Sequence, residues 1–120
     1  MARLVGIIAN RPDLTNRLAA HQREVLCSHN HDEEPWGWGV GFFQSGEILL
    51  KRRPLDERVD LTLEEMISDV RSDIMLAHIR HATVGALCTD NPHPFRYRQW
   101  MFADTGTVDG FGELRGRLYE

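Results

Sequence analysis

The chain has 120 residues, of which 42% are apolar and 27% charged. This is an ordinary globular composition, which excludes a fibrous or disordered chain. The length predicts a single domain over residues 1–120. A net charge of −4 provides no attraction to nucleic acid or to an anionic membrane, and no apolar run is long enough to span a bilayer. The only two cysteines, Cys27 and Cys88, are far apart, which argues against a disulfide framework and indicates a reducing, cytoplasmic setting.

The first third of the sequence predicts a strand, a helix and a loop. A continuous apolar run over residues 3–9 is typical of a buried strand. Residues 10–13 carry turn signals, with Pro12 placed to start the helix that follows. Apolar residues then recur at helical spacing over 14–26, and the polar segment 27–36 lacks any period.

The middle third predicts a hairpin and a second helix. Residues 40–44 and 47–51 flank Ser45-Gly46, a turn signal in which glycine can adopt positive φ. Thr62 followed by Glu65 resembles a capping box and predicts a helix that runs to about Ser72.

The last third predicts a strand over 74–79, a hairpin formed by 99–103 and 107–108, and a short amphipathic helix over 111–119. Strands outnumber helices and do not alternate with them regularly. The sequence therefore indicates an α+β fold rather than a doubly wound one.

Five segments stand out by their glycine, histidine and aromatic residues. They are ARLVGII at 2–8, WGWGVG at 36–41, AHIRHATVG at 77–85, NPHPF at 91–95 and WMFADTGTV at 100–108. In order and spacing they resemble the class II glutamine amidotransferases, whose glutaminase domain has an N-terminal-nucleophile (Ntn) hydrolase fold. The resemblance implies an Ntn-hydrolase-like αββα arrangement, with two antiparallel sheets packed face to face and covered by helices. It also implies that residues 1–120 are the N-terminal portion of such a domain, truncated on the C-terminal side.

The family's catalytic residue is a Cys that becomes the first residue of the mature chain, and Ala2 stands at that position here. In the family the Cys thiol attacks the amide and its free α-amino group acts as the base. Ala2 keeps the amine after removal of Met1 and has no thiol. The resemblance therefore implies a degenerate member without the nucleophile.

The resemblance also implies a ligand site. Arg80 matches the family arginine that binds the α-carboxylate of glutamine, and a guanidinium at a strand end suits bidentate carboxylate recognition. Thr83 would support that contact through its hydroxyl. The alternatives are an Arg80 that pairs with an acid for structural reasons and a Thr83 that only supports a turn.

A third family feature is the oxyanion hole, written His-Asn-Gly in the family and Asp104-Thr105-Gly106 here. The backbone N–H of Gly106 would remain as one donor of the oxyanion hole and would also contact the ligand. The Thr105 side chain is shorter than that of Asn, so its hydroxyl reaches less far. A carboxylate at Asp104 would oppose a developing negative charge if it faced the site. Alternatively, Asp104 only fixes the turn before Gly106.

Histidine and cysteine residues also raise the question of a metal site. Cys27, His29 and His31 alternate, but no fourth ligand at a recognised spacing completes a zinc site, so we expect no metal and no cofactor. We expect His78 to be packed or hydrogen-bonded, and His93 to be structural near the site.

Three functional hypotheses follow. The first is an inactive amidotransferase-like domain that binds glutamine or another small carboxylate for regulation or scaffolding. The second is an active glutaminase, releasing glutamate and ammonia, whose Cys was replaced by Ala2. The third is a structural interaction domain with an exposed sheet edge. A protein partner or a homo-oligomer is expected; nucleic acid and membrane are not.

Overall fold

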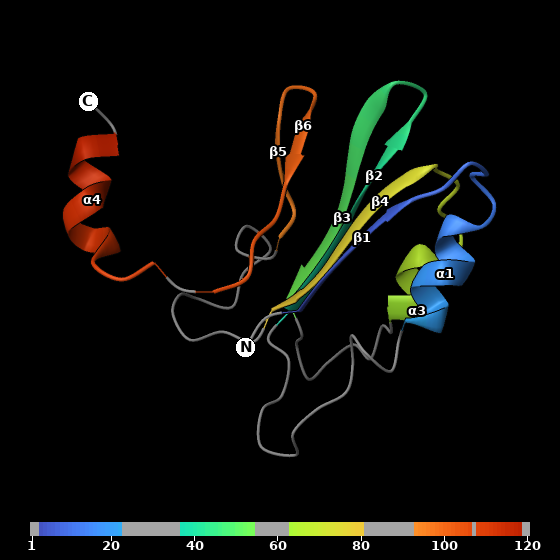
Figure 1. The fold of residues 1–120 in the computed structure, drawn as a ribbon, viewed down its shortest axis with the longest axis horizontal. Helices are drawn as coiled ribbons and strands as arrows, with labels where there is room; N and C mark the ends of the chain where they lie inside the picture. The colour runs from blue at the N-terminus through green and yellow to red at the C-terminus, as the bar shows by residue number, and fades with distance from the viewer. Residues whose placement is uncertain (1–2, 23–36, 55–62, 81–92, 107, 119–120) are drawn as a thin grey trace, which may run out of the picture.

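The computed structural model describes residues 3–22, 37–54, 63–80, 93–106 and 108–118. They form a mixed α+β fold around a four-stranded antiparallel sheet (Figure 1). The strand order is β1-β4-β2-β3, and the bounds of these strands are Arg3–Ile8 (β1), Gly37–Gln44 (β2), Glu47–Pro54 (β3) and Ile74–Arg80 (β4). The predictions of strands at 3–9 and 74–79 are confirmed, and so is the α+β class.

The β2–β3 hairpin forms as predicted and is longer than expected. Its turn residues Ser45 and Gly46 have φ values of 53° and 80°, the pair of positive φ angles that a two-residue type I′ turn requires. Antiparallel pairing continues from Gln44 opposite Glu47 to Gly37 opposite Pro54.

One face of the sheet is covered by α1 (Thr15–His21) and α3 (Leu63–Ile67), which lie beside each other (Figure 1). The side chains that alternate onto this face form the hydrophobic core together with residues from the helical segments. Its buried members are Ala19, Trp38, Val40, Phe42, Met66, Ile67, Val70, Met75, Ala77 and Ile79. The buried Thr15 hydroxyl donates a hydrogen bond to the Ser72 carbonyl, which fixes the start of α1 beside the segment that enters β4.

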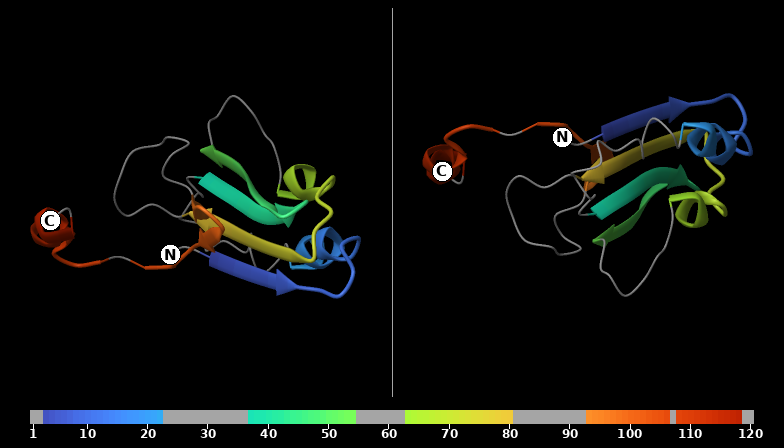
Figure 2. Two further views of the ribbon diagram at one scale, coloured as in Figure 1. Left: turned by 90° about the horizontal axis from the view of Figure 1, so that it is seen from above. Right: turned by 90° about the horizontal axis from the view of Figure 1, so that it is seen from below.

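The opposite face is approached by a second, two-stranded sheet, made of β5 (Phe95–Tyr97) and β6 (Trp100–Phe102) (Figures 1 and 2). Gly39 and Gly41 of β2 make this approach possible. A Cβ at Gly39 would overlap the carbonyl oxygen of His93, and one at Gly41 would lie 2.8 Å from Cγ of Pro94 and overlap Sδ of Met101. Because Gly39 and Gly41 have no side chains, the second layer can contact the backbone of β2 directly.

Two sequence predictions about the strands are wrong in detail. The first strand is not buried on both faces: its burial alternates, because β1 is at the edge of the sheet and only its helix-facing residues are covered. The last hairpin joins 95–97 to 100–102 instead of 99–103 to 107–108. Its turn contains Arg98 at a φ of 52°, a residue that gives no turn signal in the sequence.

The helix predictions are right in place and too long. α3 ends at Ile67 and not near Ser72, because the chain turns there to bring Val70 into the core. α1 begins at Thr15, one residue later than predicted, and the stretch beyond Gln22 lies outside the described residues, as do the predicted loop 27–36 and Thr62.

The predicted C-terminal helix forms as α4 (Phe111–Leu118), which stands apart from the sheet and buries no residue (Figures 1 and 2). Within the described ranges, no helix has both the length and the apolar character needed to cross a membrane.

Candidate functional site

The candidate site lies where β4 ends beside the two segments that flank the β5–β6 hairpin. Because side chains alternate along a strand, His78 and Arg80 share one face of β4, opposite to the core face of Ala77 and Ile79. β4 is an inner strand, paired with β1 and β2 on its two sides. Both side chains therefore project from the rigid part of the sheet toward the second layer.

His78 is 2% exposed and connects the two layers through one hydrogen bond. Its Nε2 lies 3.0 Å from the backbone carbonyl oxygen of Asp104. A carbonyl can only accept, so Nε2 carries the proton and Nδ1 of the neutral ring is an acceptor. No described residue donates to that buried Nδ1. The pKa of His78 is lowered to about 4, mainly by burial and also by the charges of His93 and Arg80, while the contact with Asp104 opposes the shift, so the ring is neutral at pH 7.

His93 stacks on His78 and contacts the same aspartate. The two ring centroids are 4.5 Å apart with an angle of 26° between the planes. The Asp104 backbone N–H donates to Nδ1 of His93 over 3.1 Å, and Oδ1 of Asp104 lies 3.2 Å from the same nitrogen. Burial lowers the pKa of His93, the Asp104 carboxylate opposes that shift, and the positive charge of Arg80 adds to it.

The segment that resembles a degenerate oxyanion hole follows directly from this contact. Asp104, Thr105 and Gly106 are all exposed, and Gly106 has a φ of 122°, in the region that favours glycine. A Cβ at Gly106 would meet nothing within 4 Å. The Asp104 carboxylate lies beside the imidazole of His93. The backbone carbonyl and N–H of Asp104 are hydrogen-bonded to His78 and His93, respectively. The histidine contacts thus fix the backbone of Asp104, two residues before Gly106.

Two of the predicted site residues, Arg80 and Gly106, lie within the described ranges. Arg80 follows His78 by two residues on the same strand face, and its charge acts on both His78 and His93. Gly106 follows Asp104 by two positions. Ala2 and Thr83 lie outside the described residues, and so do Cys27, His29 and His31. Among the residues that the structure does describe, no group of three or more potential ligands could hold a metal ion.

Sequence reasoning missed that His78, His93 and Asp104 form one cluster. It treated the two histidines separately and Asp104 as a member of the degenerate hole. The available signal was indirect. Strand alternation places His78 on the face of Arg80, and Gly39, the register partner of His78, leaves room there for the His93 backbone. Nothing in the sequence specifies that the hairpin would meet that glycine.

Comparison with known proteins places this chain in a family. The model of the class II glutamine amidotransferases matches residues 1–120. The Escherichia coli protein YafJ, whose name assigns it to the glutamine amidotransferases, is 27% identical over 121 residues, which cover 95% of this chain and 46% of that protein. The γ-glutamyl-hercynylcysteine sulfoxide hydrolase of Mycobacterium tuberculosis is 35% identical over 74 residues, covering 61% of this chain and 32% of that protein.

An uncharacterized protein of Methanocaldococcus jannaschii is 31% identical over 91 residues, covering 72% of this chain and 26% of that protein. The chain thus spans less than half the length of these curated relatives. No solved structure gives a significant match. Because the family model covers the whole chain, the chain belongs to the class II glutamine amidotransferase family, for which an Ntn-hydrolase fold is implied.

Proposed function

We propose that this chain is a class II glutamine amidotransferase-like domain that has lost thiol chemistry and has kept a site for glutamine or another small carboxylate. The proposal is supported by the position of Arg80 on the face of β4 that also carries His78, and by the contacts of His78 and His93 with Asp104, two residues before Gly106. A cation that can bind a carboxylate and a backbone donor that can bind a carbonyl oxygen thus lie at one end of the sheet.

Inactivity is inferred from two separate departures from the family pattern. An alanine methyl group at position 2 cannot be activated as a nucleophile by any neighbour. Thr105 replaces the family asparagine, and loss of one oxyanion donor lowers the rate by about two to three powers of ten. A replacement of the Cys alone would leave the second change unexplained. This favours a naturally degenerate member over an active glutaminase altered only at Ala2.

The binding site is tested by calorimetric titration with glutamine and with a γ-glutamyl amide. The second probe is chosen because one relative is named as a hydrolase of a γ-glutamyl compound. Arg80→Ala is expected to weaken binding about 10- to 100-fold, since hydrogen bonds to charged groups contribute about 1.5–3 kcal/mol. Arg17→Ala, at an exposed position of α1, is the matched control and should bind like the wild type. Absence of heat in the wild type, or binding unchanged by Arg80→Ala, would refute the site.

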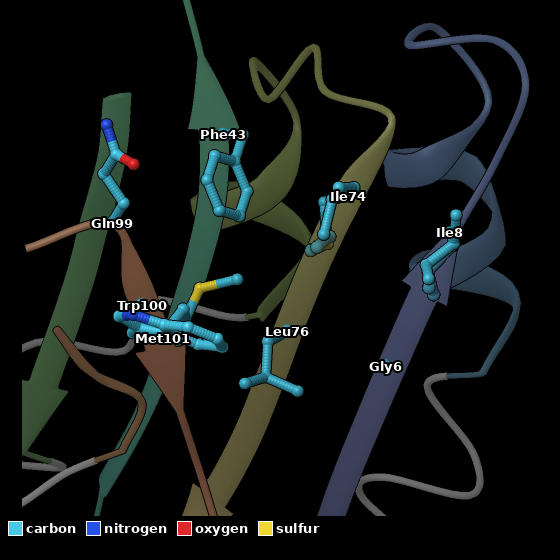
Figure 3. Close-up of a pocket in the computed structure, with 10 residues that line it drawn as sticks. Gly6, Ile8, Phe43, Ile74, Leu76, Gln99, Trp100 and Met101 are labelled. Carbon is cyan, nitrogen blue, oxygen red and sulfur yellow. The ribbon is translucent and has the colours of Figure 1, made fainter. Parts of the chain in front are cut away.

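A second candidate role is self-association through β1, favoured by the exposed edge of the sheet. β1 pairs with β4 on one side, and no other described strand pairs with it. Ile8 is 86% exposed and Leu4 38%. Beside them is an apolar pocket of about 540 Å³ between β1, β4 and the hairpin, with Leu76 and Trp100 among its lining residues (Figure 3).

The occupant that fits this edge is a second copy of the chain. A two-fold axis at Gly6 would place Leu4 opposite Ile8 and Val5 opposite Ile7 of the second copy, apolar against apolar on both faces. In this register Arg3 would lie beside Ala9 of the second copy. The Ala9 N–H donates to the Asp73 carbonyl over 2.8 Å, so an exposed carboxylate would lie near the guanidinium. Light scattering at several protein concentrations tests this dimer, which a monomer at all concentrations would exclude.

A further inference from the structure

The backbone of Asp104 is held from both sides by side chains of two histidines. Its carbonyl oxygen accepts from Nε2 of His78 at 3.0 Å, and its N–H donates to Nδ1 of His93 at 3.1 Å. Both peptide groups that flank the Asp104 Cα are therefore fixed. Beyond them, no described residue would contact a Cβ at Gly106, so side-chain packing there does not hold the segment.

The two histidines are themselves fixed by the first sheet. His78 is buried on inner strand β4, and its register partners Leu4 and Gly39 carry no charge. His93 stacks on His78, and its carbonyl oxygen lies where a side chain at Gly39 would be. The positions of both imidazoles are thus set by the sheet and not by the exposed loop.

We propose that His78 and His93 form a clamp on Asp104 that fixes the backbone of Thr105 and Gly106 while both imidazoles are neutral. They are positioning residues, and neither needs to touch a ligand. The inference deepens the proposed function, because Gly106 is the donor that would face the ligand, and it rests on that function only for the ligand itself. The contacts of His78 and His93 with Asp104 do not depend on a bound ligand.

Protonation would open the clamp, because Nδ1 of His93 cannot accept and donate at once. In the neutral ring Nδ1 accepts the Asp104 N–H. In the imidazolium the same nitrogen carries a proton and donates to Oδ1 of Asp104, 3.2 Å away, and the backbone N–H loses its acceptor. Protonation of His78 would place a second N–H at buried Nδ1, where no described residue offers an acceptor.

The charges around the pair favour the closed state at neutral pH. Arg80 on β4 disfavours imidazolium at both rings, and the Asp104 carboxylate favours it. On β3, Arg52 faces the same layer, with its Cγ 3.1 Å from where a Cβ at Gly39 would stand. β2 presents only glycines there. The charge of Arg80 and the burial of both rings thus act against protonation, and the Asp104 carboxylate acts in its favour.

The test is amide hydrogen exchange by NMR, with no ligand present. The Asp104 side chain is 52% exposed, so slow exchange of its amide would report the hydrogen bond to His93 rather than burial. At pH 7 we expect a protection factor of at least about 10, from a hydrogen bond of about 1.4 kcal/mol. His93→Asn, whose Oδ1 takes the place of Nδ1, should retain it, and His93→Leu should lose it. His21→Leu, at the exposed end of α1, is the control.

A pH series covers the case in which His93→Leu does not fold. As the pH is lowered from 6.5 to 5.5, above the range in which His78 is protonated, the protection factor of the wild-type Asp104 amide should fall as His93 takes up a proton, while that of His93→Asn, which has no imidazole at this position, should stay constant. An unprotected Asp104 amide in the wild type at pH 7, or protection in His93→Asn that falls in parallel with the wild type, would overturn the clamp. Protection that follows the expected pattern supports it even in a protein that gives no heat with glutamine, a result that counts against the proposed function alone.

Discussion

Single glycines decide how the two layers of this protein meet. Gly39 gives no indication of its neighbour in the sequence, yet its missing Cβ is the space occupied by the His93 backbone. The same residue thereby determines how close His93 comes to His78 and Asp104. The packing of the two layers and the geometry of the candidate site therefore both depend on the absence of a side chain at residue 39.

Gly39→Ala should destabilise the protein, since the new Cβ would overlap backbone that cannot rotate away. Overpacking of this kind costs about 1–3 kcal/mol in the free energy of unfolding. Urea denaturation measures it, and Gly116→Ala is the control because a Cβ there meets nothing within 4 Å on exposed α4. Equal stability of Gly39→Ala and wild type would mean that the layers do not touch at this point.

His78 should make folding stability depend on pH. Its pKa is 6.5 in the unfolded chain and about 4 in the folded one. Between these values the unfolded chain binds more protons, so the free energy of unfolding rises with pH. The contribution is complete above about pH 6.5 and is lost as the pH falls through about 4.

Urea denaturation at pH 7 and pH 4.5 should therefore show a loss of about 1–3 kcal/mol at the lower pH. His78→Gln, which keeps a donor at the position of Nε2 and does not titrate, should reduce that loss. An identical pH dependence in wild type and His78→Gln would show that another group is responsible.

At the scale of elements, the sequence predicted those whose signal is local. Ser45-Gly46 between two apolar runs predicts a hairpin, because its two residues adopt positive φ. The β5–β6 hairpin was misplaced because Arg98 adopts positive φ without any sequence signal. β1 was predicted as buried because a continuous apolar run does not reveal that a strand lies at the edge of its sheet.

The edge position of β1 leads to a prediction about assembly. Ile8→Lys would place a charge on the exposed edge, a substitution that blocks strand pairing, and should shift the protein toward monomer by at least about tenfold in Kd. Leu118→Lys is the matched control, since Leu118 is also a strongly exposed apolar residue but lies on α4. Sedimentation equilibrium compares the two. A wild-type dimer insensitive to Ile8→Lys would place the interface elsewhere.

At the scale of the whole molecule, the order of motifs along the sequence was sufficient to predict the family, and the family model covers residues 1–120. The roles of Arg80 and Gly106 follow from motif position in the sequence and stay predictions. The sequence does not identify the His78–His93–Asp104 cluster, because that cluster depends on how the β5–β6 hairpin packs over Gly39. The bounds of this hairpin are predicted wrongly from the sequence. Long-range contacts of this kind leave no local pattern in a single sequence.

We propose that thiol chemistry has been lost at more than one position of this chain. Ala2→Cys, with removal of Met1 verified by mass spectrometry, tests it most directly through ammonia release from glutamine. We predict release at background level, and a measurable rate only when Asp104→His and Thr105→Asn are added to restore the family's oxyanion segment. Robust turnover by Ala2→Cys alone would contradict the account, because it would mean that only the nucleophile was missing.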